Sequence, residues 1–152
     1  MQDNDFRALI RQSAKVEAEI MEWYKANVDG KTRLARPMTK EYDILCPAVG
    51  NVEVKEDKMA SHTGFYAFET EDRLGNPSGI AVTTAEEFVI VDDTHVLRSK
   101  TLSLLFLIRN STERKIIQMG VRDKEGRRAL GYLIPTGELV YSPYVEVINK
   151  WF

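Results

Sequence analysis

The feature that most constrains the fold is the placement of Asp43 and Glu53 on either side of a Pro-Ala-Val-Gly-Asn turn. In a hairpin with strands over 42–46 and 51–56, these residues are directly opposed, with Cβ atoms roughly 5 Å apart on one face. Side chains alternate along a strand, so Lys55 shares the face of Glu53. Opposed carboxylates repel each other, and the pattern therefore predicts a hard divalent cation with oxygen ligands, beside a lysine.

Composition sets broad limits on the protein class. A chain of 152 residues predicts one domain over 1–152 with a substantial core. The net charge of −2 means that any nucleic-acid binding would come from local basic patches. The single Cys46 excludes an internal disulfide and is typical of a reducing compartment. No secretory signal opens the chain, and the apolar run 102–108 is far shorter than the ~20 residues that span a bilayer. We expect a soluble, cytoplasmic protein without a membrane partner.

The chain opens with a predicted helix. A cap at Asp3, Asn4 or Asp5 is followed by a stretch without Gly or Pro that extends to about Val28. Its apolar side chains recur at helical spacing, and Glu17 lies on the same side. A carboxylate on a core-facing stripe is costly unless it is paired or ligating, and the alternative is an edge residue that reaches solvent.

Strands dominate the rest of the chain. An aromatic-rich strand is predicted over Phe65–Thr70, and a buried strand over Phe88–Val91. Between them, Ile80–Ala85 begins a short helix or turn, whereas the run 102–108 is ambiguous between helix and strand. Further strands are expected at Ile116–Val121, Leu130–Ile134 and Leu139–Tyr141, with turns at Lys124–Gly126 and Pro135–Gly137. This order predicts a single mixed α/β domain.

Other groups of reactive side chains have simpler explanations. Asp92-Asp93-Thr94-His95 contains possible transition-metal ligands, but a strand-ending turn with Asx hydrogen bonds is the favoured interpretation. His62 is either a supporting phosphate contact or a surface residue. Cys46 is expected to be a small core residue rather than a nucleophile.

The residues and their order resemble the PD-(D/E)XK nuclease superfamily. Asp43, preceded by Tyr42, stands where the family has its Pro-Asp pair, and Glu53-Val54-Lys55 matches the second motif. Glu17 lies where many members place a further acidic residue on the first helix. Small phage-encoded nucleases and resolvases of this superfamily are similar at Thr63-Gly64 and at Ser78-Gly79-Ile80 followed by Thr83-Thr84-Ala85.

The resemblance covers roughly residues 5–95 and implies a restriction-endonuclease-like core of order α-β-β-β-α-β, with a mixed central sheet flanked by helices. Residues 96–152 carry no family signal, and are expected to complete the domain or to form a dimer interface. The implied activity is an endonuclease that hydrolyses DNA phosphodiester bonds with Mg²⁺ or Mn²⁺. Recognition of junctions or branched DNA by a homodimer would suit so small a chain.

The expected roles follow from the chemistry of the residues. Asp43, Glu53 and the backbone carbonyl of Val54 would hold the metal, and Glu17 a second ion or its hydration shell. Lys55 would orient or deprotonate the attacking water, or donate to the phosphate. Contacts with the nucleic-acid backbone are expected from three groups: the loop residues Lys31, Arg33, Arg36 and Lys40; the hydroxyls of Thr63, Thr83 and Thr84; and the cluster Arg122, Lys124, Arg127 and Arg128.

A different class of function explains the same residues. In a non-catalytic nucleic-acid-binding or protein-interaction module, Glu53 and Lys55 would be an ordinary ion pair worth under ~1 kcal/mol.

Overall fold

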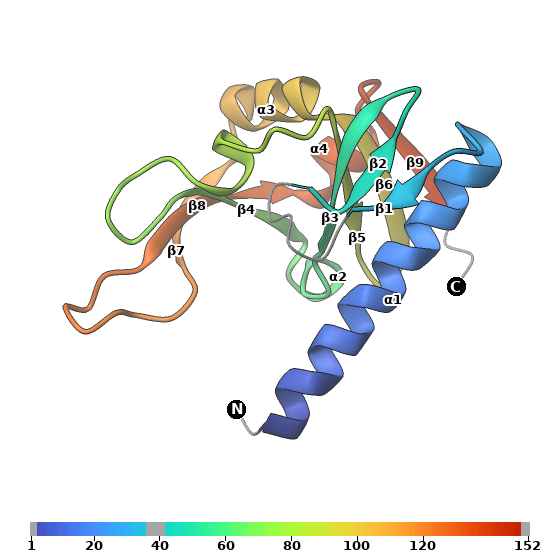
Figure 1. Ribbon diagram of the computed structural model, residues 1–152. Coiled ribbons are helices and arrows are strands. Elements are labelled where there is room, and N and C mark those ends of the chain that lie inside the picture. The colour runs from blue at the N-terminus through green and yellow to red at the C-terminus, as the bar shows by residue number, and fades with distance from the viewer. Residues whose placement is uncertain (1–2, 36–41, 150–152) are drawn as a thin grey trace.

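Two β-sheets of different size organise the chain (Figure 1). The structure is a computed structural model that describes residues 3–35 and 42–149, with the backbone alone for 3–12 and Asn149. The larger sheet has the order β1-β2-β3-β5-β6-β9. Its strands are β1 (Arg33–Leu34), β2 (Ile44–Cys46), β3 (Gly50–Glu56), β5 (Glu87–Val91), β6 (His95–Lys100) and β9 (Val145–Asn149). Neighbouring strands are antiparallel except β3 and β5, which are parallel.

The smaller sheet has the order β4-β8-β7 and is antiparallel throughout. It consists of β4 (Phe65–Glu71), β7 (Lys115–Met119) and β8 (Ala129–Pro135). The helices are α1 (Asp3–Asn27), α2 (Ala60–Thr63), α3 (Thr101–Asn110) and α4 (Thr136–Val140), with a 3-10 turn η1 at Gly79–Ala81. No helix within the described residues combines the length and apolar character that crossing a bilayer requires.

Helix α1 covers one face of the larger sheet (Figure 1). Its lack of Gly and Pro lets it run for 25 residues, and its apolar stripe is buried against strands β2, β3, β5 and β6. The buried side chains of this first core are Val16, Ile20, Tyr24, Ile44, Cys46, Val52, Val89, Val91 and Val96. Cys46 is thus a core residue, as the sequence predicted.

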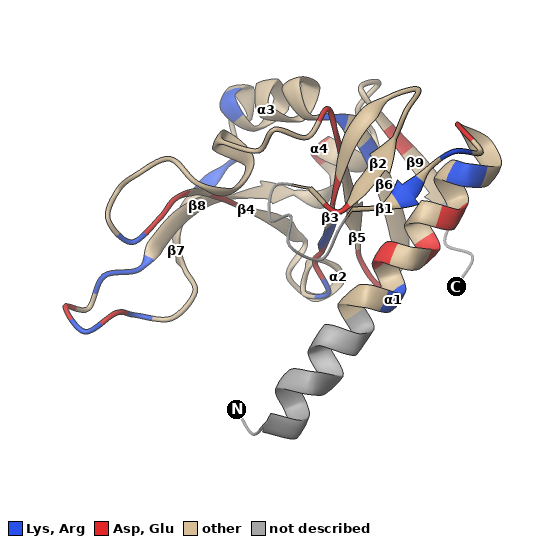
Figure 2. Ribbon diagram, viewed as in Figure 1, with Lys and Arg blue, Asp and Glu red and all other residues tan. Residues whose placement is uncertain are grey.

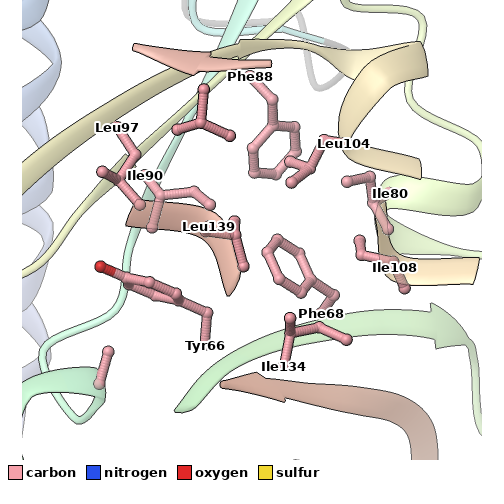
Figure 3. Close-up of a cluster of buried hydrophobic side chains, with 12 residues drawn as sticks. Tyr66, Phe68, Ile80, Phe88, Ile90, Leu97, Leu104, Ile108, Ile134 and Leu139 are labelled. Carbon is pink, nitrogen blue, oxygen red and sulfur yellow. The ribbon is translucent and has the colours of Figure 1, made fainter. Parts of the chain in front are cut away.

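A second core fills the opposite face, between the larger sheet, the smaller sheet and helices α3 and α4 (Figure 3). Phe88 and Ile90 of β5 point into it, whereas Val89 and Val91 of the same strand point toward α1. Strand β5 is therefore buried on both faces, which explains its continuous apolar sequence. Figure 3 shows Phe68 of β4 beside Ile134 and below Leu104 and Ile108 of α3.

The predicted mixed α/β fold class is confirmed, and the residues after 95 complete both sheets. Strands β6 and β9 join the larger sheet, while β7 and β8 build the smaller one. The aromatic strand expected at 65–70 is β4, and it lies in the smaller sheet rather than beside β3. The ambiguous run 102–108 is helical.

One expected strand is wrong. Leu139–Tyr141 lies at the end of α4, and the turn expected at Pro135–Gly137 is where that helix begins. In a strand, Leu139 and Tyr141 would share a face, but Leu139 is buried and Tyr141 is 87% exposed. Three apolar residues are too few to distinguish the two periods.

A buried ion pair fastens α1 to the larger sheet. The Glu87 carboxylate on β5 accepts hydrogen bonds from Tyr24 Oη (2.7 Å) and from Arg98 Nε (2.6 Å) and Nη2 (3.0 Å). The Arg98 guanidinium also lies over the rings of Trp23 and Tyr24 on α1. Burial raises the pKa of Tyr24, and so does the carboxylate that its hydroxyl contacts. Removing one partner would leave the other charge buried without compensation.

We expect Arg98→Met to lower the free energy of unfolding by about 3 kcal/mol, because it leaves the Glu87 carboxylate with Tyr24 alone. The double variant Glu87→Gln/Arg98→Met should recover much of this loss, since the glutamine is uncharged and still accepts from Tyr24. Urea unfolding measures both values. A loss below about 0.5 kcal/mol in the single variant would show that the pair does not stabilise the fold.

Candidate active site

The β2–β3 hairpin has the register predicted from the sequence. Ile44 pairs with Val52 and Cys46 with Gly50, which centres the turn on Ala48. The ladder ends at Ile44, and the side chain of the preceding Asp43 turns to accept a hydrogen bond from the backbone N–H of Val54 (2.7 Å). Burial raises the pKa of Asp43, although this hydrogen bond opposes the shift.

Glu53 occupies the opposite strand and bonds to a hydroxyl from a distant loop. Its Oε2 accepts a hydrogen bond from Thr83 Oγ1 at 2.5 Å, and Thr83 Oγ1 accepts in turn from the backbone N–H of Ala85 (3.2 Å). Burial raises the pKa of Glu53, and the charge of Asp43 raises it further. The carboxylate of Asp43 therefore lies within electrostatic reach of Glu53, across the hairpin.

Lys55 points into the second core. Its ammonium lies 4.9 Å from the centre of the Phe68 ring on β4. Val52 and Val54 face the first core, so the predicted alternation along β3 is confirmed. Burial lowers the pKa of Lys55, against the opposing effect of three nearby carboxylates, those of Asp57, Glu69 and Glu53. Perturbed ionisable groups that gather in this way are typical of functional sites.

Glu17 on α1 lies on the other face of β3 from Lys55, within electrostatic reach of Asp43. It is half-buried, and burial raises its pKa together with the charges of Asp43 and Glu56. Glu56 follows Lys55 on β3, and its Oε1 is buried without a hydrogen-bond partner among the described residues. The sequence placed Glu17 beside Asp43 but did not indicate Glu56.

Two further acidic residues near Lys55 were missed because they depend on the smaller sheet. Glu69 lies on β4, where its Oε2 accepts a hydrogen bond from Ser78 Oγ (2.8 Å). Asp57 follows β3 and accepts from the backbone N–H of Ala67, also on β4 (2.9 Å). Neither residue carries a local sequence signal, since both contacts join segments that only the tertiary fold brings together.

The described residues hold no complete set of metal ligands supplied by side chains. Within residues 3–35 and 42–149, no three His, Cys, Asp or Glu side chains come together closely enough to hold an ion. Mg²⁺ is commonly bound by one or two carboxylates and several waters. Asp43 and Glu53 can supply two carboxylates, whereas Glu56 lies on the α1 face of β3, within electrostatic reach of Glu17. Val54 is seen to contribute its N–H to Asp43, while metal binding by its carbonyl stays a prediction.

The predicted nucleic-acid contacts are dispersed. Lys31 and Arg33 are exposed near β1, whereas Arg36 and Lys40 lie outside the described residues. Figure 1 shows the loop after β7, which carries Arg122, Lys124, Arg127 and Arg128, on the opposite side of the molecule from β1. These two basic segments therefore do not form one surface.

The three threonines behave differently from one another. Thr83 bonds to Glu53 and belongs to the site itself. Thr63 bonds to the backbone of Phe65, so its hydroxyl caps local structure. Thr84 is exposed next to Thr83, and its hydroxyl makes no such capping hydrogen bond among the described residues.

The segment 92–95 is the predicted Asx turn. Asp92 Oδ1 accepts from the backbone N–H groups of Thr94 (2.7 Å) and His95 (2.5 Å), and its other oxygen accepts from Tyr66 Oη. His62 is exposed and lies 3.7 Å from a carboxylate oxygen of Asp93.

No known protein-family model matches this chain, and no curated protein is similar to it at a significant level. Any functional assignment must therefore come from the site geometry.

The raised pKa of Glu53 predicts that its charge destabilises the metal-free protein. The folded state holds this proton more tightly than the unfolded chain, so the free energy of unfolding falls as pH rises from about 4.3 through the raised pKa. We expect Glu53→Gln to increase the free energy of unfolding at pH 7 by about 1 kcal/mol, with no gain below pH 4. Glu71→Gln removes an exposed carboxylate on β4 and is the control. It should leave the free energy of unfolding unchanged at both pH values. Thermal unfolding at pH 4 and 7 measures the difference, and a destabilised Glu53→Gln at pH 7 would contradict it.

Proposed function

We propose that this protein is a Mg²⁺- or Mn²⁺-dependent endonuclease that hydrolyses DNA phosphodiester bonds, with selectivity for junctions or branched DNA. The observation that carries the proposal is the cluster of Asp43, Glu53 and Lys55 on one hairpin. In it, the charge of Asp43 disfavours the charged form of Glu53, and the half-buried ammonium of Lys55 lies within electrostatic reach of Glu53. The resemblance of these residues to the PD-(D/E)XK motifs agrees with this chemistry.

Each residue has a role that its surroundings support. The carboxylates of Asp43 and Glu53 would bind the divalent ion, with Glu17 within electrostatic reach of Asp43. A bound ion of this kind lowers the pKa of water and neutralises charge on the phosphate oxygens. Burial favours the neutral amine of Lys55, so this side chain is suited to orient the attacking water or to accept its proton.

The non-catalytic module is the second candidate, and the donor count favours it. No group of three metal-binding side chains is present in the part of the chain that is described. A protein that binds DNA in Mg²⁺ and Mn²⁺ but cleaves no form of it would belong to this class.

We further propose that the enzyme works as a homodimer in the cytoplasm, since two sites related by a two-fold axis would cut two strands. Helix α3 exposes Leu102 (80%) and Phe106 (58%), apolar side chains that would suit a contact between copies.

Cleavage assays test the proposal directly. With supercoiled, linear, branched and single-stranded DNA in Mg²⁺ or Mn²⁺, we expect cleavage by the wild type. We expect a loss of at least about 100-fold in Asp43→Asn, Glu53→Gln and Lys55→Met. The matched controls are Glu71→Gln and Lys100→Met, which neutralise exposed residues of β4 and β6 and should retain full activity. Cleavage that persists in the three site variants would show that the nuclease activity lies elsewhere.

Thr83 is expected to position Glu53 for metal binding. Removing its hydroxyl in Thr83→Val should weaken Mg²⁺ or Mn²⁺ binding about 10-fold, because Glu53 loses its hydrogen bond. Thr83→Ser keeps the hydroxyl and should restore the affinity. The stabilisation of each variant by the metal, measured by thermal unfolding, gives the affinity without an activity assay. Equal affinities in the Val and Ser variants would contradict the role of the hydroxyl.

A further inference from the structure

Positive charge is concentrated in one segment of an otherwise acidic chain. Residues 109–135 contain seven Lys and Arg against three Asp and Glu, whereas the whole chain contains 21 against 23. This segment spans the end of α3, strands β7 and β8 and the loop between them. Figure 2 shows its blue residues along the β7–β8 hairpin and the loop at its end, which projects from the body of the molecule.

The acidic residues of this loop are used to hold its own structure. Asp123 accepts hydrogen bonds from the backbone N–H groups of Glu125 and Arg127 and from Arg127 Nε (2.8 Å). The second acid, Glu125, accepts from Arg127 Nη2 at 3.1 Å. One arginine therefore pairs with both carboxylates, and the remaining cations of the loop give it a net positive charge.

Two of those cations are fixed in position by backbone carbonyls. Arg122 Nη1 donates to the carbonyl of Gly126 (3.0 Å), and Arg128 Nε donates to that of Gly120 (2.9 Å). Each guanidinium has five N–H donors, so these contacts orient it and leave other donors for a ligand. Lys124 is exposed at the loop between them. Guanidinium groups held in this way lose less entropy when they bind phosphate.

A cleft lies beside this loop, and Asp72 and Asp123 line it as well as Arg73. It has a volume of about 480 Å³ and lies between the 120–128 loop and the loop that follows β4, with Arg73 and Leu74 on its wall. Glu69 also lines the cleft, and Glu69 is one of the carboxylates that act on Lys55.

We propose that the β7–β8 hairpin is an arm that grips the sugar–phosphate backbone of duplex DNA, with Arg122, Lys124 and Arg128 as its phosphate contacts. Strand β8 also pairs with β4, so the 120–128 loop and the strand ends that carry it are the part that would enter the major groove of B-form DNA, which is ~12 Å wide. The deep, narrow groove of an A-form RNA helix excludes it. The inference takes its ligand class from the proposed function, but binding by the arm does not require cleavage.

Binding of a labelled 20-base-pair DNA duplex in EDTA, followed by fluorescence anisotropy from 50 to 200 mM salt, tests the arm. We expect the triple variant Arg122→Gln/Lys124→Gln/Arg128→Gln to bind the duplex at least about 10-fold more weakly at 100 mM salt. The slope of log binding constant against log salt concentration should also become smaller by 2–3, since each lost phosphate contact removes about 0.9. The control Lys15→Gln/Lys25→Gln/Lys58→Gln makes the same change in net charge at exposed sites away from the hairpin, and should keep the wild-type slope.

Four results would overturn the proposal: wild-type binding by the arm triple variant, equal weakening in both triple variants, equal or tighter binding of a double-stranded RNA of the same sequence, or preferential binding to phosphatidylserine vesicles. Lys124→Glu alone guards against misfolding of the triple variant, because Lys124 is exposed, and it should also reduce the salt slope. If the arm variants lose binding and the wild type cleaves no DNA, the proposal for the arm stands and the nuclease proposal is wrong. If the arm variants bind and cleave as the wild type does, the nuclease proposal stands and the proposal for the arm is wrong.

Discussion

The alternation of side chains along β3 is the constraint on which the site depends. Val52 and Val54 pack under α1, while Lys55 points to the other side of the sheet, over Phe68. The strand is fixed between β2 and the doubly buried β5, so neither set of side chains can exchange faces without losing a core. A polar cluster can therefore persist beside an apolar core because the apolar residues of the same strand fix its register.

This arrangement carries an electrostatic cost that the rest of the fold must offset. Burial disfavours the charged forms of Asp43, Glu53 and Lys55 alike. Structural ion pairs in the same molecule are built differently: Glu87 receives two bonds from Arg98 and one from Tyr24. The contrast separates a pair that fastens α1 from a cluster whose charges remain only partly compensated. Incomplete compensation of this kind is typical of functional sites.

The elements that the sequence predicted well are those governed by local periodicity. The hairpin register followed from the symmetry of Asp43 and Glu53 about a turn, and α1 followed from helical spacing without Gly or Pro. Contacts between the two sheets could not be predicted in this way. Strand β4 looked like a neighbour of β3 in the chain, but it pairs with β8, more than sixty residues later. Glu69 and Asp57 enter the surroundings of Lys55 only through that pairing, so a pattern within one segment could not reveal them.

One short segment shows how these nonlocal contacts are fixed. Ser78 donates to Glu69 on the smaller sheet, and Thr83 donates to Glu53 on the larger one. Between them, Gly79 adopts a φ of +55°, and a Cβ at this position would lie 2.3 Å from the carbonyl oxygen of Glu69. Only glycine allows so close an approach in that conformation. The segment therefore sets the positions of two carboxylates that act on Lys55, one from each sheet, and makes the geometry of the site depend on how the sheets are joined.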